Sequence, residues 1–187
     1  MTLAIRERTL ENISRVKNLI KIYERIKDDK TDHNTDVLRA AVVLLHAALE
    51  DCLRSLSYSK LPFASPDELH KTEYRVQLGK IAEYRGKAVD ELIKDVSFEY
   101  LERATYNNSG DISKALKSLA ITIQKSQLNQ LDTAIKRRHK IVHRADRSDQ
   151  DEEVGRVTSI QANHVLKWVE DVERFIEMVF SKSGSAL

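Results

Sequence analysis

The chain has 187 residues, and its 31 Lys and Arg against 29 Asp and Glu give a net charge of +2, too balanced for a protein that coats nucleic acid through bulk charge. With 5 Gly, 2 Pro and 32% charged residues, the composition favours helices and argues against an all-β sandwich, a collagen-like repeat or a disordered linker. A single cysteine, Cys52, excludes an intramolecular disulfide framework and a Cys-rich zinc site. The single cysteine and the lack of a leading apolar segment lead us to expect a cytoplasmic protein, and because no run of about 18 apolar residues occurs, we expect no membrane span.

Hydrophobic periodicity predicts two of four main helices in the first third of the chain. Residues 5–27 carry apolar side chains at three- and four-residue steps between charges, which is typical of an amphipathic helix. Residues 37–56 form the most apolar segment, and either Thr35 or Asp36 can cap its start. Because this segment is apolar nearly all round, we expect it to be the central, buried helix.

Short helices are predicted in the middle of the chain. Ser65, Pro66 and Glu68 have the spacing of a helix start, with a serine cap, a proline at the first helical position and a capping-box glutamate. Residues 88–104 predict a longer helix, and we expect Asp111 to cap a short one. These small helices are therefore inserted between the second and third main helices.

The last two main helices are predicted in the final third of the chain. Residues 127–143 form one, and Ser159 is expected to cap the other, whose apolar stripe includes Trp168 as a core side chain. Residues 144–155 are charged and aperiodic, which is typical of a solvent loop, and residues 182–187 are expected to fray. Together the elements predict a single all-α domain over the whole chain, a bundle of four main helices with short inserted helices.

The densest group of reactive side chains lies near the end of the third main helix. Six positive side chains and one acid, Asp146, give a local charge of +5 between positions 136 and 147. The positive residues are Lys136, Arg137, Arg138, Lys140, Arg144 and Arg147. Such a patch attracts phosphate in a salt-dependent way, and Arg137, Lys140, Arg144 and Arg147 are candidates for contacts with an RNA backbone. The alternative is a solvated basic helix end, which the helix dipole favours without any ligand.

Two histidines in this segment, His139 and His143, are four residues apart and so share one face of a helix. Two imidazoles at this spacing can hold zinc, but a third protein ligand is then expected, and no Glu follows His139 directly as in the zincin pattern. The neighbouring arginines also disfavour a dication. We therefore expect neither a metal nor another cofactor.

Acid–base chemistry on a phosphodiester is the other interpretation. His143 can remove the proton of a ribose 2′-OH, and Arg138 can stabilise the charge of the phosphorane. On an ideal helix these two residues lie about 140° apart, so one helix does not easily aim both at one atom. A twofold dimer can do so by placing two such helices side by side around a composite cleft.

Two acids on the apolar helix are candidate supporting residues. Glu50 or Asp51 can pair with Arg138 and position it, because polar groups on such a helix either have buried partners or face a site. The alternative is that they pair with a structural arginine or cap a helix.

Residues 138–143, RHKIVH, fit the pattern R-x4-6-H with a polar residue directly after the arginine, and this resembles the motif of the HEPN superfamily (higher eukaryotes and prokaryotes nucleotide-binding domains). Other segments resemble the HEPN branch grouped with RiboL-PSP proteins, and the likeness spans residues 37–179. These segments are residues 44–51, 100–108 and 131–143, and residues 157–160 before a Trp-bearing helix. One position departs from the branch, since Arg144 stands where a small residue such as Gly often follows the last His.

The resemblance implies an all-α HEPN fold and a homodimer in which the motifs of both subunits face one cleft. Many HEPN proteins are metal-independent endoribonucleases, and others are inactive binding or sensor modules. By position, the resemblance implies that Arg138 and His143 are catalytic and that His139 orients the phosphate or the other motif residues.

These observations predict an endoribonuclease of the HEPN type that acts as a toxin or phage-defence effector, with RNA as substrate and an antitoxin or other neutralising protein as partner. The first alternative is a non-catalytic HEPN module that binds nucleic acid or nucleotide, or scaffolds a partner. The second is a four-helix interaction protein whose basic patch meets an acidic partner.

Overall fold

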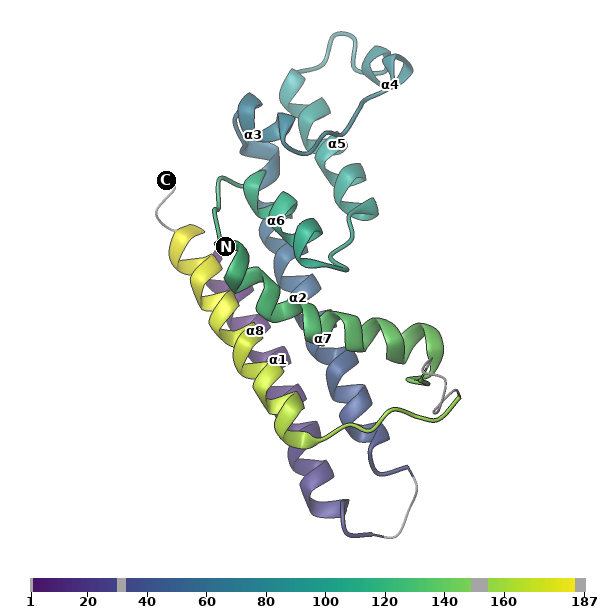
Figure 1. Ribbon diagram of the computed structural model, residues 1–187. Coiled ribbons are helices and arrows are strands. Elements are labelled where there is room, and N and C mark those ends of the chain that lie inside the picture. Colours follow the sequence, from purple (N-terminus) through teal and green to yellow (C-terminus); the bar gives the residue numbers. More distant parts are fainter. Residues whose placement is uncertain (1, 30–32, 149–154, 184–187) are drawn as a thin grey trace.

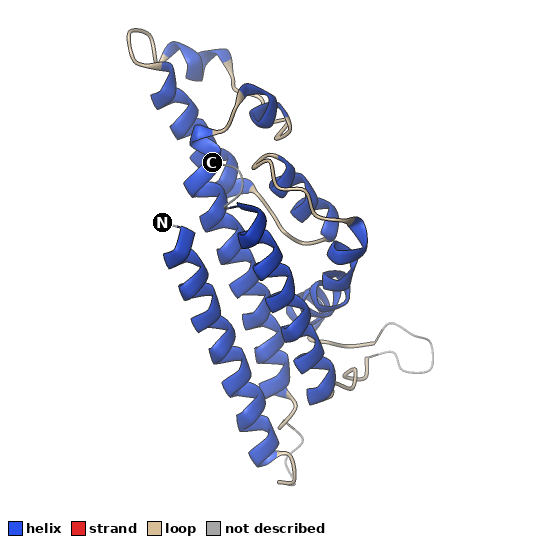
Figure 2. Ribbon diagram, turned by 90° about the vertical axis from the view of Figure 1, so that its left-hand side faces the viewer, coloured by secondary structure: helices blue, strands red, loops and turns tan. Residues whose placement is uncertain are grey.

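All regular structure in the described part of the chain is helical (Figure 1, Figure 2). The computed structural model describes residues 2–29, 33–148 and 155–183. Within these ranges the only extended pairing is an isolated bridge between Arg147 and Val157. The all-α prediction is confirmed.

Four long helices carry the fold, as predicted, and five short ones lie between the second and third of them. The long helices are α1 (Thr2–Ile26), α2 (Asp36–Lys60), α7 (Lys125–Arg144) and α8 (Ala162–Ser183). The inserted helices are the 3-10 turn η1 (Leu61–Phe63), α3 (Pro66–His70), α4 (Leu78–Ala82), α5 (Val89–Arg103) and α6 (Ser109–Lys117).

The long helices α1, α2 and α8 run side by side, and α7 lies across α2 and α8 (Figure 1, Figure 2). The short helices gather around the C-terminal end of α2. Each long helix has apolar side chains at the spacing of one face, so the four faces can close on a common core. Among the buried core residues are Ile13, Val16, Leu38, Leu45, Leu49, Leu131, Val165 and Phe175. The arrangement leaves the C-terminal half of α7 at the side of the bundle, where Lys136 and Arg144 are exposed.

Helix α2 is central but not buried on all sides. It packs against α1, α7 and α8, as its apolar composition predicts. However, Ala40 and Ala47 are exposed, and Val43 and Leu44 are half-buried. These four positions follow the spacing i, i+3, i+4, i+7 and so form one face. The prediction of a buried helix therefore holds only in part, because the described helices cover this face incompletely: Leu44 packs against the core, but Ala40 and Ala47 are exposed.

The predicted helix starts are partly confirmed. Ser65 begins α3 with a complete capping box. The Ser65 hydroxyl accepts from the backbone N–H of Glu68, and the Glu68 carboxylate accepts from the backbone N–H of Ser65. At α6 the prediction of Asp111 as cap is wrong. Asn108 is the cap, and its side-chain oxygen accepts from the Asp111 N–H at 2.9 Å. An asparagine three positions upstream reaches that N–H, as capping geometry requires.

Helix α8 differs from prediction at both ends. It begins at Ala162, so Ser159 is not its cap; the Ser159 carbonyl accepts instead from Arg137. It ends at Ser183, which is buried and whose carbonyl accepts from the Lys60 ammonium at 2.7 Å. Residues 182 and 183 are therefore helical, and the rest of the segment expected to fray lies outside the described residues.

Candidate functional site

The C-terminal end of α7 is fixed by a sharp change of backbone direction. After Arg144, both Ala145 and Asp146 adopt positive φ values, 47° and 58°, and the Asp146 N–H donates to the Lys140 carbonyl. The left-handed residue Ala145 ends α7 in the usual way for a helix C-terminus.

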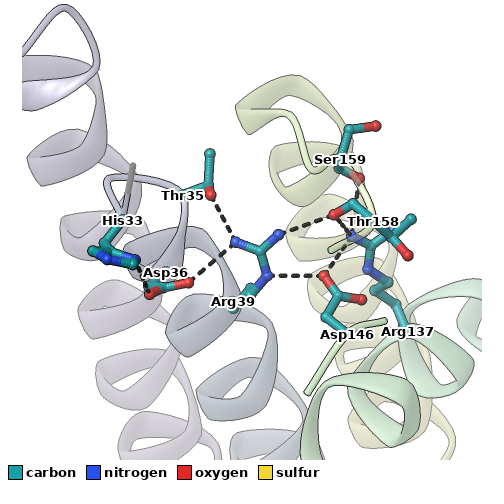
Figure 3. A network of polar contacts seen from close by, with 8 residues as sticks. All are labelled: His33, Thr35, Asp36, Arg39, Arg137, Asp146, Thr158 and Ser159. Carbon is teal, nitrogen blue, oxygen red and sulfur yellow. Dashed lines mark hydrogen bonds and ion pairs between the residues drawn. The ribbon is translucent and has the colours of Figure 1, made fainter. Parts of the chain in front are cut away.

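A buried ionic network holds this turn against the rest of the bundle (Figure 3). The Asp146 side chain is 0% exposed, and one of its carboxylate oxygens accepts from Arg39 of α2 at 2.9 Å and from Arg137 of α7 at 2.7 Å. Both arginines also donate to the Thr158 carbonyl at 2.9 Å. The network therefore ties together α2, the end of α7 and the segment that leads into α8.

The network also changes the interpretation of two sequence features. Arg137, a candidate RNA-binding residue, directs its guanidinium into the network, and its side chain is only 15% exposed. The segment expected to be a solvent loop contains two buried residues in its described part, Asp146 and Ser148. The Ser148 N–H donates to the Arg156 carbonyl at 2.8 Å. The segment is a loop as predicted, but the prediction of solvent exposure is wrong for these two residues, because Arg39 and Arg137 pair with Asp146 and the backbone of Arg156 pairs with Ser148.

The two motif histidines lie on the outside of α7. His139 and His143 are both exposed, and their rings are in contact, with centroids 4.4 Å apart and planes tilted by 45°. Neither ring makes a hydrogen bond to another described residue. Two imidazoles are therefore open to a ligand from solvent. No group of three or more potential metal-ligating side chains occurs within the described ranges.

Arg138 points away from the histidines, toward α2 and the connection between α5 and α6. Its side chain is half-buried, and one terminal nitrogen lies 3.5 Å from the side-chain oxygen of Asn107. Its Nε is buried and has no hydrogen-bond partner in the part of the chain that the structure describes. Asn107 lies in one of the segments that resemble the HEPN branch, but residue type and spacing alone gave no reason to select it. The structure adds it to the site as a direct contact of Arg138.

His46 of α2 is a second group that the structure adds to the neighbourhood of Arg138. It is 4% exposed, and neither ring nitrogen makes a hydrogen bond to another described residue, although Nε2 lies 3.8 Å from a Glu50 carboxylate oxygen. Burial lowers its pKa, the nearby Arg138 charge lowers it further, and the Glu50 charge acts in the opposite direction. His46 is therefore neutral at pH 7 and adds no positive charge beside Arg138.

The two predicted supporting acids have other partners. Glu50 pairs with Arg54 at 2.9 Å, and Asp51 pairs with Arg8 at 3.1 Å. Within the described ranges, neither forms an ion pair with Arg138. Their pairing with structural arginines is the alternative left open by the sequence.

The site as a whole offers a half-buried guanidinium, that of Arg138, and two exposed imidazoles on different sides of one helix. Arg138 faces the bundle while His143 faces solvent, in keeping with their separation of about 140° around α7. Among the other predicted RNA contacts, Arg144 and Arg147 are exposed, whereas Lys140 is half-buried like Arg137. One chain thus presents a guanidinium and two imidazoles on the same helix without bringing them to one point.

A model of the RiboL-PSP-HEPN family matches residues 10–183. The chain belongs to this family. The resemblance carried by the RHKIVH motif and the earlier segments is therefore confirmed, and the RiboL-PSP-HEPN match extends beyond residues 37–179 on both sides. No curated protein and no solved structure matches the chain. Among the described residues, no helix is both long and apolar enough to cross a membrane.

Proposed function

We propose that this RiboL-PSP-HEPN protein is a metal-independent endoribonuclease whose active site forms between two copies of the chain. The observation that carries the proposal is the exposed imidazole pair of His139 and His143 on the same helix as Arg138, within a basic segment. Imidazole moves protons near neutral pH, and a guanidinium stabilises charge on phosphate oxygens. These are the two functions that cleavage of RNA by its own 2′-OH requires.

The chemistry follows from the atoms at hand. The His143 imidazole of one copy accepts the proton of a ribose 2′-OH, and the freed oxygen attacks the adjacent phosphorus. Arg138 stabilises the extra negative charge of the phosphorane. The bond to the 5′ oxygen then breaks, and that oxygen takes a proton from an imidazolium of the cleft. The products are a 2′,3′-cyclic phosphate and a 5′-hydroxyl, with no net change in protons.

Two features favour a site shared by two copies. Arg138 and His143 face different directions in one chain, so a second copy can supply the missing group to each. Helix α2 also leaves Ala40, Val43, Leu44 and Ala47 incompletely covered in the described structure, an apolar face that a second copy can bury.

The test is a gel assay of total RNA in EDTA. We expect the wild-type protein to cut RNA and His143→Ala to abolish cutting. His33→Ala is the matched control, because His33 is an exposed histidine in the connection before α2 and should retain full activity. Equal cutting by wild type and His143→Ala would contradict the proposal.

An RNA-cutting activity harms the cell that contains it unless it is restrained. We therefore infer a toxin or phage-defence effector that a protein antitoxin holds in check. Expression of wild type, but not of His143→Ala, should arrest growth in the absence of such a partner. The same separation of Arg138 and His143 favours a non-catalytic RNA-binding module if the chain remains a monomer. Binding without cleavage in the gel assay would identify that case.

A further inference from the structure

A second cationic feature lies beside the HEPN motif. A cavity of about 280 Å³ opens between α7 and the first turns of α8. Lys136 and Lys140 of α7 line one side of it, and His164 and Trp168 of α8 line the other. None of the described residues around it is acidic. The cavity therefore combines positive charge with an aromatic side chain, the combination found in grooves that bind single-stranded nucleic acid.

Trp168 is the unusual member of the apolar stripe on α8. Val165, Val169 and Val172 of this stripe are buried, whereas Trp168 is only half-buried and lines the cavity. Its indole N–H makes no hydrogen bond to another described residue. The prediction that Trp168 is an ordinary core residue is therefore incomplete, because part of the side chain packs on the core and part is open to a ligand.

The buried ionic network around Asp146 holds in place the part of the cavity lining that lies between α7 and α8. Arg137 lines the cavity and is held by Asp146, and it donates to the Ser159 carbonyl at 2.9 Å from within the same wall. Ligand binding here requires little ordering of this wall, which favours affinity.

The cavity is aligned with the motif histidine. Lys136 and His143 are seven residues apart, so they lie within about 20° of each other around α7 and about 10 Å apart along its axis. An RNA strand that places a phosphodiester at His143 and continues along α7 toward its N-terminus therefore passes the cavity within a few nucleotides.

We infer that this cavity, the Trp168 pocket, binds one nucleobase and the adjoining backbone phosphates of single-stranded RNA close to the bond that is cut. The inference rests on the proposed function for its substrate class. In this arrangement the base stacks on the Trp168 indole, and Lys136 and Lys140 contact the phosphates on either side.

The first experiment uses the intrinsic fluorescence of Trp168, the single tryptophan of the chain. A dye-labelled RNA oligonucleotide with every 2′-OH methylated binds without being cleaved, because it lacks the nucleophile. We expect the tryptophan emission to be quenched along the same curve that fluorescence anisotropy of the dye gives for binding. An abasic strand of equal length should bind more weakly and leave the emission unchanged. Binding of the full strand with unchanged emission would overturn the inference.

The second experiment uses variants of the pocket. Trp168→Leu retains an apolar side chain on the core and should weaken binding about 10-fold. Lys136→Gln should lower the slope of log affinity against log salt concentration by about 0.7, the contribution of one single-strand phosphate contact. Lys125→Gln is the matched control, since Lys125 is exposed at the other end of α7 and does not line the pocket. A circular dichroism melt checks that Trp168→Leu folds. If it does not fold, equal salt slopes for RNA binding by Lys136→Gln and Lys125→Gln would still refute RNA binding by the Trp168 pocket.

Cleavage assays separate this inference from the proposed nuclease. If the wild type never cuts unmodified RNA but the tryptophan emission is quenched and Lys136→Gln lowers the salt slope, the Trp168 pocket is supported as an RNA-binding site and the proposed nuclease activity is refuted. If the wild type cuts RNA and Trp168→Leu has an unchanged KM for RNA, the proposed nuclease activity is supported and RNA binding by the Trp168 pocket is refuted. Equal affinity for a free nucleoside monophosphate and for the strand would replace the RNA subsite with a nucleotide site.

Discussion

Substitution of Asp146 tests the network that positions the candidate site. Its carboxylate is fully buried, and one oxygen accepts from both Arg39 and Arg137, whose side chains are 11% and 15% exposed. Asp146→Asn retains the shape and suits the left-handed backbone at φ 58°, so the change removes little besides the charge. The mostly buried Arg137 guanidinium then loses its counter-ion, whereas Arg39 retains an ion pair with Asp36 at 3.2 Å.

Breaking a buried ion pair by removing one partner typically destabilises a protein by about 3–5 kcal/mol. We therefore expect Asp146→Asn to lower the free energy of unfolding by about 3 kcal/mol, and the melting temperature by roughly 6–12 °C for a chain of this size. Urea denaturation followed by circular dichroism measures the first quantity, and a thermal scan measures the second.

The control is the exposed ion pair between Arg8 and Asp51, whose side chains are 51% and 43% exposed. Asp51→Asn should change the free energy of unfolding by less than about 1 kcal/mol, because solvent screens such a pair. If Asp146→Asn is no more destabilising than Asp51→Asn, the claim that the network fixes the end of α7 is refuted.

Three further predictions concern single buried or contacting groups. Because burial lowers the pKa of His46, the unfolded chain binds a proton more readily than the folded one. The free energy of unfolding should therefore fall as the pH decreases below about 6.5, by at most about 1.4 kcal/mol per pH unit. Urea titrations at pH 7.5 and 5.5 should show a smaller fall for His46→Leu than for the wild type. Asn107→Ala should lower kcat for RNA more than KM, because Asn107 contacts Arg138; a wild-type kcat would remove it from the site. Burial raises the pKa of Cys52 to about 11, so a thiol reagent such as DTNB should react with it only after unfolding, and rapid reaction of the native protein would contradict its burial.

The sequence was sufficient for features that depend on neighbouring residues. The four long helices follow from apolar side chains at three- and four-residue spacing, and the capping box of Ser65 follows from a glutamate three positions later. The motif histidines share a face because four residues make just over one helical turn, and the structure places their rings in contact.

Features that depend on partners far along the chain could not be predicted in this way. Asp146 is buried because Arg39, 107 positions away, supplies a counter-charge, and nothing local to Asp146 indicates this. Likewise, Asp51 pairs with Arg8, which lies 43 positions away in the chain, and no residue close to Asp51 in sequence indicates this pairing. Trp168 fits the helical spacing of a core residue, and only the packing of α7 against α8 shows that a cavity remains beside it.

The most direct test of the shared active site is complementation between two inactive variants. Arg138→Gln and His143→Ala are mixed in equal amounts, allowed to exchange subunits, and assayed on RNA in EDTA. A mixed dimer contains one intact arginine and one intact histidine on different chains. The account predicts that the mixture regains cutting, to about a quarter of the wild-type rate, because half of the dimers are mixed and each has one of two sites intact. A mixture that remains as inactive as either variant alone, while the wild type cuts, would contradict it.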